Sequence, residues 1–331
     1  MTKETLLKPI YLDITSSLGR EALISVEVIQ SLWGGYGELV RLHFPDRSRV
    51  IVKHVRLPEK SQHPKGWNTQ LSHQRKVHSY QVETIWYRDY SQLLDERCPM
   101  PQGLLCKQSD EEWLIVMEDL VSQGFPDTRN EANSEHLDSC LCWLANFHAK
   151  HIGHQPTALW ETGTYWHLDT RPDELKAMKD KDLQAQASKL DQLLTLAPYQ
   201  TLVHGDAKLA NFCFSHDGKQ AAAVDFQYVG AGCAMKDVAL FMSSAVKPDD
   251  CQQMEAQILD TYFKHLGTAL HYYQPHLDRE DVEKAWRPLF YVAWADFHRF
   301  VKGWSPDHWK INPYTEQLTR SVLANIGSEP L

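Results

Sequence analysis

The chain has 331 residues. This length is large for one compact domain and predicts two lobes. Hydrophobic residues make up 43% and charged residues 23% of the sequence, a composition typical of a globular protein. The formal net charge is −9 and no long run of lysine and arginine is present, which argues against nucleic acid or an anionic membrane as a partner.

The first third of the chain contains patterns typical of β-strands. Residues 24–33, 38–44 and 49–55 are rich in valine, isoleucine and other residues that favour strands, and turn or glycine-rich segments separate them. We therefore expect three consecutive antiparallel strands with a glycine-rich first turn. A sheet of this kind would cover a nucleotide.

A long loop, a helix and another strand follow. Residues 58–73 are polar and interrupted by proline and glycine, so we expect a loop there. The next apolar residues lie near helical spacing and predict a helix that carries Glu83. Residues 113–117 form a buried strand that ends near Gly124. The expected organisation is an N-terminal lobe at 1–117, a hinge at 118–123 and a C-terminal lobe at 124–331.

The remaining sequence indicates a mainly helical lobe. Apolar residues recur there at helical spacing, and Asp217-Gly218 is a strong hairpin turn signal. The overall pattern predicts an α+β fold. We expect helices at residues 134–151, 173–196, 236–265 and 279–303.

One segment carries the residue types needed for phosphoryl transfer. Asp206 is followed by Lys208 and Asn211, and a second apolar run leads to Asp225. Transfer from a nucleotide needs a carboxylate that deprotonates the attacking hydroxyl, a cation near the phosphate, and an amide with a second carboxylate as Mg²⁺ ligands. The spacing of Asp206 and Asn211 repeats that of the protein-kinase catalytic loop. A plain polar turn also contains Asp and Asn, but the complete ordered set favours a catalytic loop.

The order of these motifs resembles the protein-kinase-like fold in its small-molecule branch, the aminoglycoside phosphotransferase and choline kinase-like group. Asp225-Phe226-Gln227, in place of Asp-Phe-Gly, and the Met-Glu-Asp-Leu at 117–120 resemble the ecdysteroid kinase-like subset. The resemblance runs from about residue 24 to residue 244 and is weak beyond it. It implies a bilobal fold and an enzyme that uses ATP and Mg²⁺ to phosphorylate a hydroxyl group of a small molecule.

The resemblance also implies a role for each residue of the catalytic segment. Asp206 resembles the catalytic base, which would orient the substrate hydroxyl in line with the γ-phosphate. Lys208 would contact that phosphate as a compact point charge. Asn211 and Asp225 resemble the Mg²⁺ ligands, since both offer hard oxygen donors.

In the first lobe, the resemblance implies a nucleotide site. Lys53 resembles the lysine that holds the α- and β-phosphates, and Glu83 resembles its ion-pair partner. Taken alone, each would be interpreted as a solvated surface charge. The glycine-rich loop departs from the kinase pattern but would still let backbone N–H groups approach phosphate oxygens. The other expected nucleotide-binding residues are Gly34, Gly35, Gly37, Glu118 and Leu120.

Two residues outside the motif are expected to support it. Asp237 opens a helix and resembles the family acid that stabilises the catalytic loop, and a role as helix N-cap is compatible with this. The spacing of His148, His151 and His154 could suggest a metal site, but no carboxylate or cysteine nearby completes a ligand set. We therefore expect His148 to pack beside the catalytic loop.

Three alternative functions are open to a chain with these motifs. A protein kinase is disfavoured because Gly205 occupies the position of an arginine and only eleven residues separate Asp225 from Asp237, too few for an activation loop. A catalytically silent kinase-like ATP-binding module is disfavoured because the base, the cation and both metal ligands are present. A choline-type or aminoglycoside-type kinase stays open.

The acceptor site is expected among the aromatic helices of the C-terminal lobe. Trp294 and Asp296 are the candidate residues, because a carboxylate beside aromatic rings could receive a cationic or polyhydroxyl molecule. The alternative is core packing, since Phe290, Trp294 and Phe297 lie on one helical stripe. The expected acceptor is a neutral or singly charged, partly apolar alcohol, with choline-like amines second.

Several sequence features bear on location. The N-terminus has no apolar signal core, and no stretch approaches the roughly 18 apolar residues of a membrane span. The seven cysteines are scattered and do not form a disulfide framework. We therefore expect a cytoplasmic, reduced protein, and the sequence does not indicate its oligomeric state.

Overall fold

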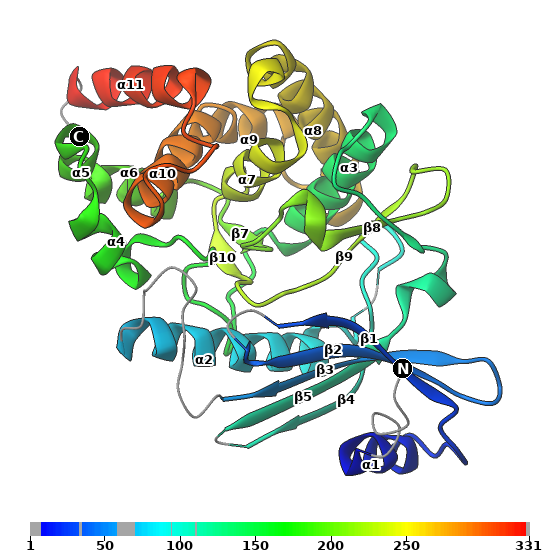
Figure 1. Cartoon of the computed structure of the whole chain (residues 1–331). Coiled ribbons are helices and arrows are strands. Elements are labelled where there is room, and N and C mark those ends of the chain that lie inside the picture. Colours follow the sequence, from blue (N-terminus) through cyan, green and yellow to red (C-terminus); the bar gives the residue numbers. More distant parts are fainter. Residues whose placement is uncertain (1–7, 33–34, 58–69, 94, 110, 329–331) are drawn as a thin grey trace. The chain divides into compact units, whose positions relative to one another are not determined.

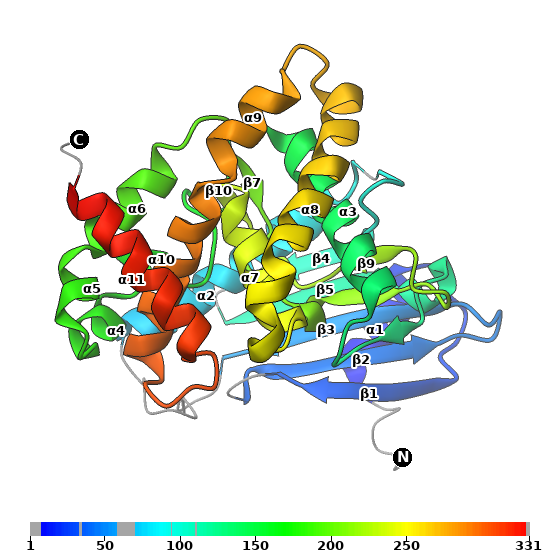
Figure 2. The ribbon, with the colours of Figure 1, turned by 90° about the horizontal axis from the view of Figure 1, so that it is seen from above.

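The computed structural model describes residues 8–32, 35–57, 70–93, 95–109 and 111–328. It divides the chain into two compact units, Met1–Asp127 and Thr128–Leu331 (Figures 1 and 2). Together with the mixed sheet and helix content, this confirms the expected α+β class with two lobes. The hinge expected at 118–123 lies within the first unit, and its hinge role stays a prediction.

The first unit is built on a five-stranded antiparallel sheet in the order β1-β2-β3-β5-β4 (Figure 1). Its three expected strands are confirmed, and β2 and β5 both pair with β3, which is therefore a central strand. The elements are α1 (Pro9–Ser17), β1 (Ser25–Ser31), β2 (Gly37–His43), β3 (Arg49–Arg56), α2 (Gln70–Ile85), a π-helical turn (Trp86–Tyr90), β4 (Gly103–Gln108) and β5 (Glu112–Glu118).

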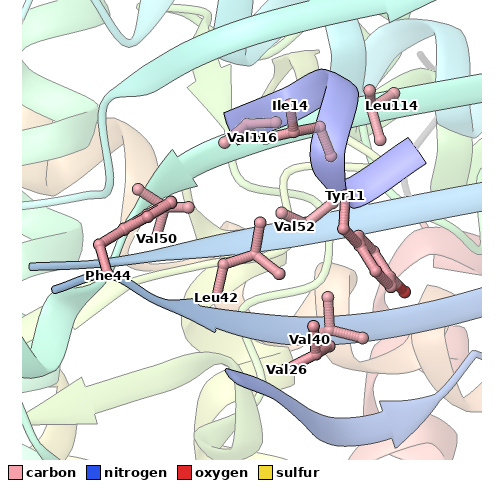
Figure 3. Packing of buried hydrophobic residues seen from close by; sticks show 10 residues of the cluster. All are labelled: Tyr11, Ile14, Val26, Val40, Leu42, Phe44, Val50, Val52, Leu114 and Val116. Carbon is pink, nitrogen blue, oxygen red and sulfur yellow. The ribbon is translucent and has the colours of Figure 1, made fainter. Parts of the chain in front are cut away.

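The alternation of side chains along β3 explains why this sheet positions a charged residue. Val50 and Val52 are buried in a cluster that also contains Tyr11 and Ile14 of α1 (Figure 3). Burying an aliphatic side chain of this size contributes about 1.5–3 kcal/mol, so the cluster holds the strand in one register. Lys53, one residue further along, consequently faces the opposite side of the sheet.

Two expectations for this unit need correction. The loop expected at 58–73 is too long, because residues 70–73 already belong to α2, while residues 58–69 lie outside the described part of the chain. The strand β4 was not expected at all. It is half-exposed, and its two leucines, Leu104 and Leu105, are adjacent rather than alternating, so the sequence has no clear period-two pattern there.

The second unit is mainly helical and carries short strands next to the expected catalytic loop (Figure 2). Helix α3 packs against α8, and α10 packs against α4, α6, α7 and α11. Its helices are α3 (Ser134–His151), α4 (Pro172–Ala177), α5 (Lys181–Ala185), α6 (Ala187–Thr195), α7 (Met235–Ala245), α8 (Cys251–Tyr273), α9 (Arg279–Trp286), α10 (Leu289–Trp304) and α11 (Pro313–Ser328). Its strands are β6 (Asp127–Thr128), β7 (Thr201–Val203), β8 (Phe212–Phe214), β9 (Ala221–Ala223) and β10 (Gly230–Gly232), the first of which begins at the unit boundary.

The helix expected at 134–151 is confirmed with its bounds, but the three longer ones are interrupted. The expected helix 173–196 is three short helices, because Asp180 caps a new start by accepting a hydrogen bond from the Leu183 amide. The expected helix 236–265 ends at Ala245, before Pro248, and restarts at Cys251. The expected helix 279–303 breaks before Pro288, which cannot donate the hydrogen bond that would continue a helix.

Two further features concern the chemistry of the chain as a whole. All seven cysteines are free thiols. Within the described ranges, every helix is either too short or too polar to cross a membrane.

Candidate active site

The expected catalytic loop follows β7, which pairs with β10. Gly205 has a positive φ of 79°, and a Cβ at this position would lie 2.0 Å from the carbonyl oxygen of Tyr228. Only glycine fits such a close approach in this conformation. The glycine that replaces the protein-kinase arginine is therefore required by the packing of the loop.

Asp206 lies at the centre of a compact polar cluster. Its Oδ2 accepts hydrogen bonds from Lys208 Nζ at 2.8 Å and from Asn211 Nδ2 at 3.1 Å. Asn211 Nδ2 also donates to the Asp206 carbonyl oxygen at 2.8 Å, which closes the loop between them. Asp206 is buried, whereas 41% of the Lys208 side chain is exposed. The carboxylate is thus held in place while its cation still reaches solvent.

Asp225 lies close to the same cluster. The backbone amide of Val224 donates to the Asn211 carbonyl oxygen at 3.0 Å, which ties the two segments together. The charges of Asp206 and, to a smaller extent, Asp225 raise the pKa of Lys208, so this lysine stays protonated. The backbone of Asp225 has a φ of 69°, a strained conformation for a residue with a side chain. Gln227 Nε2 donates to Asp225 Oδ1 at 2.7 Å and helps to hold this carboxylate.

Asp237 supports the loop from behind. Its carboxylate accepts hydrogen bonds from the backbone amides of His204 at 2.5 Å and Gly205 at 2.9 Å. His148 Nε2 lies 3.2 Å from the same carboxylate, and its Nδ1 lies 2.8 Å from the hydroxyl of Tyr262. All of these groups are buried. His148 therefore packs beside the loop as expected, and Asp237 makes the supporting contacts that the resemblance implies.

In the first unit, Lys53 and Glu83 are brought together. Lys53 Nζ donates to Glu83 Oε1 at 2.6 Å, and both side chains are buried. Two residues of the glycine-rich segment have positive φ, 76° at Gly35 and 137° at Gly37. A Cβ on Gly37 would lie 2.0 Å from the His54 carbonyl oxygen, so a side chain is excluded there. Gly34 lies outside the described residues.

The two expected hinge residues lie at the end of β5. Glu118 Oε2 accepts a hydrogen bond from the Gln102 amide at 3.0 Å and another from the side chain of Gln123. Leu120 is buried and begins a short 3-10 helix at Leu120–Gln123, which Asp119 caps through the Val121 amide. The role of both residues in nucleotide binding stays a prediction.

The two expected acceptor residues, Trp294 and Asp296, are both buried in α10. Asp296 Oδ1 lies 2.8 Å from Arg299 Nε, and Arg299 donates in turn to the carbonyl oxygen of Trp166 at 2.9 Å. Trp294 borders a hollow of about 10 Å³, room for about one water molecule. These positions favour the packing alternative for both residues, and a role in acceptor binding stays a prediction without contacts to support it.

Two residues that the motifs did not indicate lie near Asp206. The Tyr165 amide donates to the Gly205 carbonyl oxygen at 3.2 Å. Burial, and next the Asp206 charge, raise the pKa of the Tyr165 phenol. Lys310 Nζ donates to Ser243 Oγ at 2.9 Å, and the charges of Asp206 and Lys208 act on it. Both residues are distant from the catalytic loop in sequence, so no spacing rule could have found them.

A wider groove of about 720 Å³ lies in the second unit, on the side of α3 and α8. It has the size of a ligand pocket. Ser244 lines it and also accepts a hydrogen bond from the Leu209 amide of the catalytic loop at 2.9 Å. Its charged lining residues are Glu131, Asp138, Lys247 and Asp250.

A comparison with protein families gives a match within the second unit. The model of the ecdysteroid kinase-like family matches residues 159–275, which include Asp206, Lys208, Asn211 and Asp225. The expected family resemblance is confirmed over this segment. No curated protein sequence matches the chain.

Solved structures extend the likeness to the whole chain at the level of fold. A microcompartment-associated aminopropanol kinase has a TM-score of 0.54 at 12% identity, covering 95% of this chain and 94% of its own. The apoenzyme of macrolide 2′-phosphotransferase MphH from Brachybacterium faecium has a TM-score of 0.52 at 11% identity, covering 99% of each chain. A thermostable mutant of aminoglycoside phosphotransferase APH(4)-Ia in its apo form has a TM-score of 0.51 at 11% identity, covering 96% of this chain and 99% of its own. The fold is thus that of kinase-like small-molecule phosphotransferases.

Proposed function

We propose that the chain is a kinase that transfers the γ-phosphoryl group of ATP, with Mg²⁺, to a hydroxyl group of a small molecule. The observation that carries this proposal is the cluster of Asp206, Lys208, Asn211 and Asp225 in one unit. Phosphoryl transfer through a loose transition state needs alignment and charge neutralisation more than covalent help, and this cluster offers both.

Asp206 is proposed as the base. Its Oδ2 is held by two donors, so the carboxylate has a defined direction toward an incoming hydroxyl. As the hydroxyl oxygen attacks the phosphorus, its proton passes to this carboxylate. Lys208 is the cation proposed to contact the transferred phosphoryl group, since its side chain reaches solvent and stays protonated.

Asn211 and Asp225 are proposed to hold Mg²⁺, and the chemistry of the two side chains fits this ion. The Asn211 amide nitrogen is used by Asp206, and no described residue donates to the Asn211 side-chain oxygen. That oxygen and the Asp225 carboxylate are the hard donors that Mg²⁺ prefers. When bound, the ion would neutralise charge on the β- and γ-phosphates.

The first unit is proposed to bind ATP. Lys53, fixed by Glu83, would contact the α- and β-phosphates, and the backbone at Gly34, Gly35 and Gly37 would cover them. Glu118 and Leu120 would contact the adenine. These assignments rest on the resemblance together with the buried ion pair.

The proposed acceptor is a small, neutral or singly charged, partly apolar alcohol, and the proposed location is the cytoplasm. The names of the three structural neighbours refer to aminopropanol, a macrolide and an aminoglycoside, all small molecules. The eleven-residue segment between Asp225 and Asp237 is too short for a protein-kinase activation loop, which supports a small acceptor.

The test is ADP release from ATP and Mg²⁺ over a panel of alcohols. At least one alcohol should raise the rate above the alcohol-free background, and chelation of Mg²⁺ should abolish it. Asn211→Ala should raise the Mg²⁺ requirement or remove activity, whereas Asn325→Ala on the surface of α11 should change neither. Binding of ATP without alcohol-dependent turnover across the panel would instead indicate a catalytically silent ATP-binding module.

A further inference from the structure

Lys310 lies in the segment between α10 and α11, at residues 305–312. Its ammonium donates to Ser243 Oγ at 2.9 Å and lies over the rings of Phe297 and Trp309, with 5.0 Å and 5.5 Å to the ring centroids. An aromatic face attracts a cation, but more weakly than a carboxylate does in a desolvated site. The charge of Lys310 is therefore only partly compensated.

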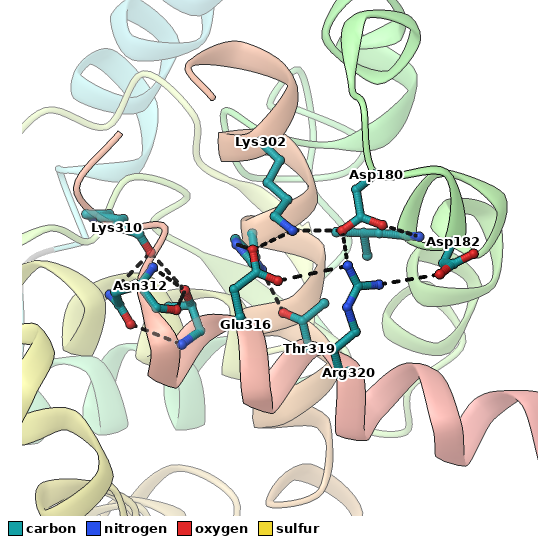
Figure 4. A network of polar contacts seen from close by, with 11 residues as sticks. Asp180, Asp182, Lys302, Lys310, Asn312, Glu316, Thr319 and Arg320 are labelled. Atoms are coloured by element: carbon teal, nitrogen blue, oxygen red, sulfur yellow. Dashed lines mark hydrogen bonds and ion pairs between the residues drawn. The ribbon is translucent and has the colours of Figure 1, made fainter. Parts of the chain in front are cut away.

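A neighbouring lysine shows how different this environment is. Lys302 in α10 lies 2.7 Å from Asp180 and 2.5 Å from Glu316, in the network drawn in Figure 4. Lys310 makes no such ion pair with any described carboxylate. An ammonium group has three donors, and the described residues accept from one of those on Lys310. The other two donors have no acceptor among the described residues, and Lys310 borders the same hollow as Trp294, with room for about one water molecule.

Lys310 is also connected to the expected catalytic loop through two adjacent serines of α7. Its partner Ser243 is adjacent to Ser244, which binds the Leu209 amide of that loop. Burial lowers the pKa of Lys310 to about 8, while the Asp206 carboxylate opposes this shift and the Lys208 ammonium adds to it. Two cations thus act near the proposed base, one from the loop and one from the far end of the chain.

We propose that Lys310 is a specificity-determining residue that binds an oxygen atom, from a carboxylate or a carbonyl group, on the acceptor alcohol. This inference rests on the proposed kinase function. The ring of Trp309, which is 56% exposed, suits an aromatic or apolar body next to that oxygen, whereas Phe297 is buried beneath the ammonium. A cationic acceptor is disfavoured, because its charge would approach Lys310 without an intervening carboxylate.

The groove beside α3 and α8 is the competing site. Its charged residues are mainly acidic and would favour a cation. Trp309 borders both sites, but Lys310 and its partner Ser243 do not line the groove, and the Asp206 charge acts on Lys310. A preference for an anionic acceptor would therefore favour the Lys310 site, and a preference for a cationic acceptor would favour the groove.

Three probes with the same alcohol and the same ring make this test direct: 4-(hydroxymethyl)benzoate, 4-(hydroxymethyl)benzamide and 4-(hydroxymethyl)benzylamine. Their binding is measured by calorimetry with Mg²⁺ and a non-hydrolysable ATP analogue, and their turnover by ADP release. We expect affinity to fall from the acid to the amide to the amine. The acid should bind roughly 10- to 100-fold more tightly than the amine, the span of a hydrogen bond to a charged group.

Variants assign the preference to one residue. Lys310→Met keeps the aliphatic stem and should remove most of the difference between acid and amine, and Lys310→Arg should restore it. The exposed Lys284→Met on α9 is the matched control and should keep the wild-type order, and thermal unfolding shows whether each variant is folded. A preference for the amine, equal binding of all three probes, no binding of any, or an unchanged order in folded Lys310→Met would overturn the proposal. The predicted binding order without ADP release would support Lys310 and end the kinase proposal instead.

Discussion

The catalytic loop and helix α10 each bury an aspartate beside a cation, but the two pairs differ in access to solvent. Asp206 bonds to Lys208, whose side chain is 41% exposed, and both belong to a loop. Asp296 bonds to Arg299, and both side chains are fully buried one turn apart on a helix. The cation of the first pair can reach a ligand from solvent, whereas the second pair is closed off from solvent.

The comparison shows that residue type and burial alone do not identify a catalytic acid. Asp296 lies beside aromatic residues and resembled an acceptor-binding residue on that ground, yet its contacts are those of a core ion pair. Asp206 is distinguished by a cation that reaches solvent, by a strained neighbour at Asp225 and by support from Asp237. The following changes would break or sharpen this contrast.

The largest effect is expected at the catalytic loop. Asp206→Asn should lower kcat by roughly 10²–10⁴-fold, the usual span for a lost general base, with ATP affinity nearly unchanged. Steady-state kinetics on an alcohol found by the panel measure the change. Asp217→Asn on the nearby hairpin turn is the control and should retain wild-type rates. Near-normal turnover by Asp206→Asn would contradict the assignment of the base.

Breaking the buried Asp296–Arg299 pair should lower the stability of the protein rather than its activity. Asp296→Asn leaves Arg299 as a buried charge without its counter-ion, which costs about 3–5 kcal/mol in comparable pairs. Urea unfolding measures the loss, and acceptor KM at a temperature where the variant is folded should change little. Asp182→Asn, at a residue whose side chain is 90% exposed, is the control and should stay within about 0.5 kcal/mol of wild type. A specific rise in acceptor KM with unchanged stability would restore Asp296 as an acceptor residue.

A third carboxylate, Asp180, should have a smaller effect on stability, and this effect should depend on pH. Burial opposes its ionisation, but hydrogen bonds from Lys302 and Arg320 outweigh burial and lower its pKa from 3.8 to about 2 (Figure 4). A lowered carboxyl pKa stabilises the folded state above pH 3.8, and this stabilisation is lost as the pH falls through about 2. The shift corresponds to about 2 kcal/mol.

Asp180→Asn should therefore unfold more easily than wild type at neutral pH and lose less further stability between pH 4 and pH 2. Thermal or urea unfolding at several pH values measures how the stability of the wild type and of the variant depends on pH. Parallel wild-type and variant curves over that range would show that Asp180 does not titrate with a lowered pKa.

Much of the fold could be predicted because its signals are local. Three strands of the sheet are rich in strand-favouring residues and are separated by turn signals, and α3 begins directly after the capping residue Asn133. The helices at 236–265 and 279–303 were predicted too long because apolar spacing continues across Pro248 and Pro288. A helical backbone does not continue through these prolines. Strand β4 was missed because half-exposed strands have weak patterns, and its pairing with β5 is what stabilises it.

By itself, the sequence determined the proposed catalytic cluster, because Asp206, Lys208 and Asn211 belong to one short loop whose spacing sets their mutual geometry. Tertiary structure alone decided two other points. It buried Asp296 against Arg299, and it carried Lys310 from the end of α10 to the side of the loop. Burial of one face of α10, like the approach of Lys310 to a loop about a hundred positions earlier, depends on how helices pack, and local composition and spacing contain no record of that packing.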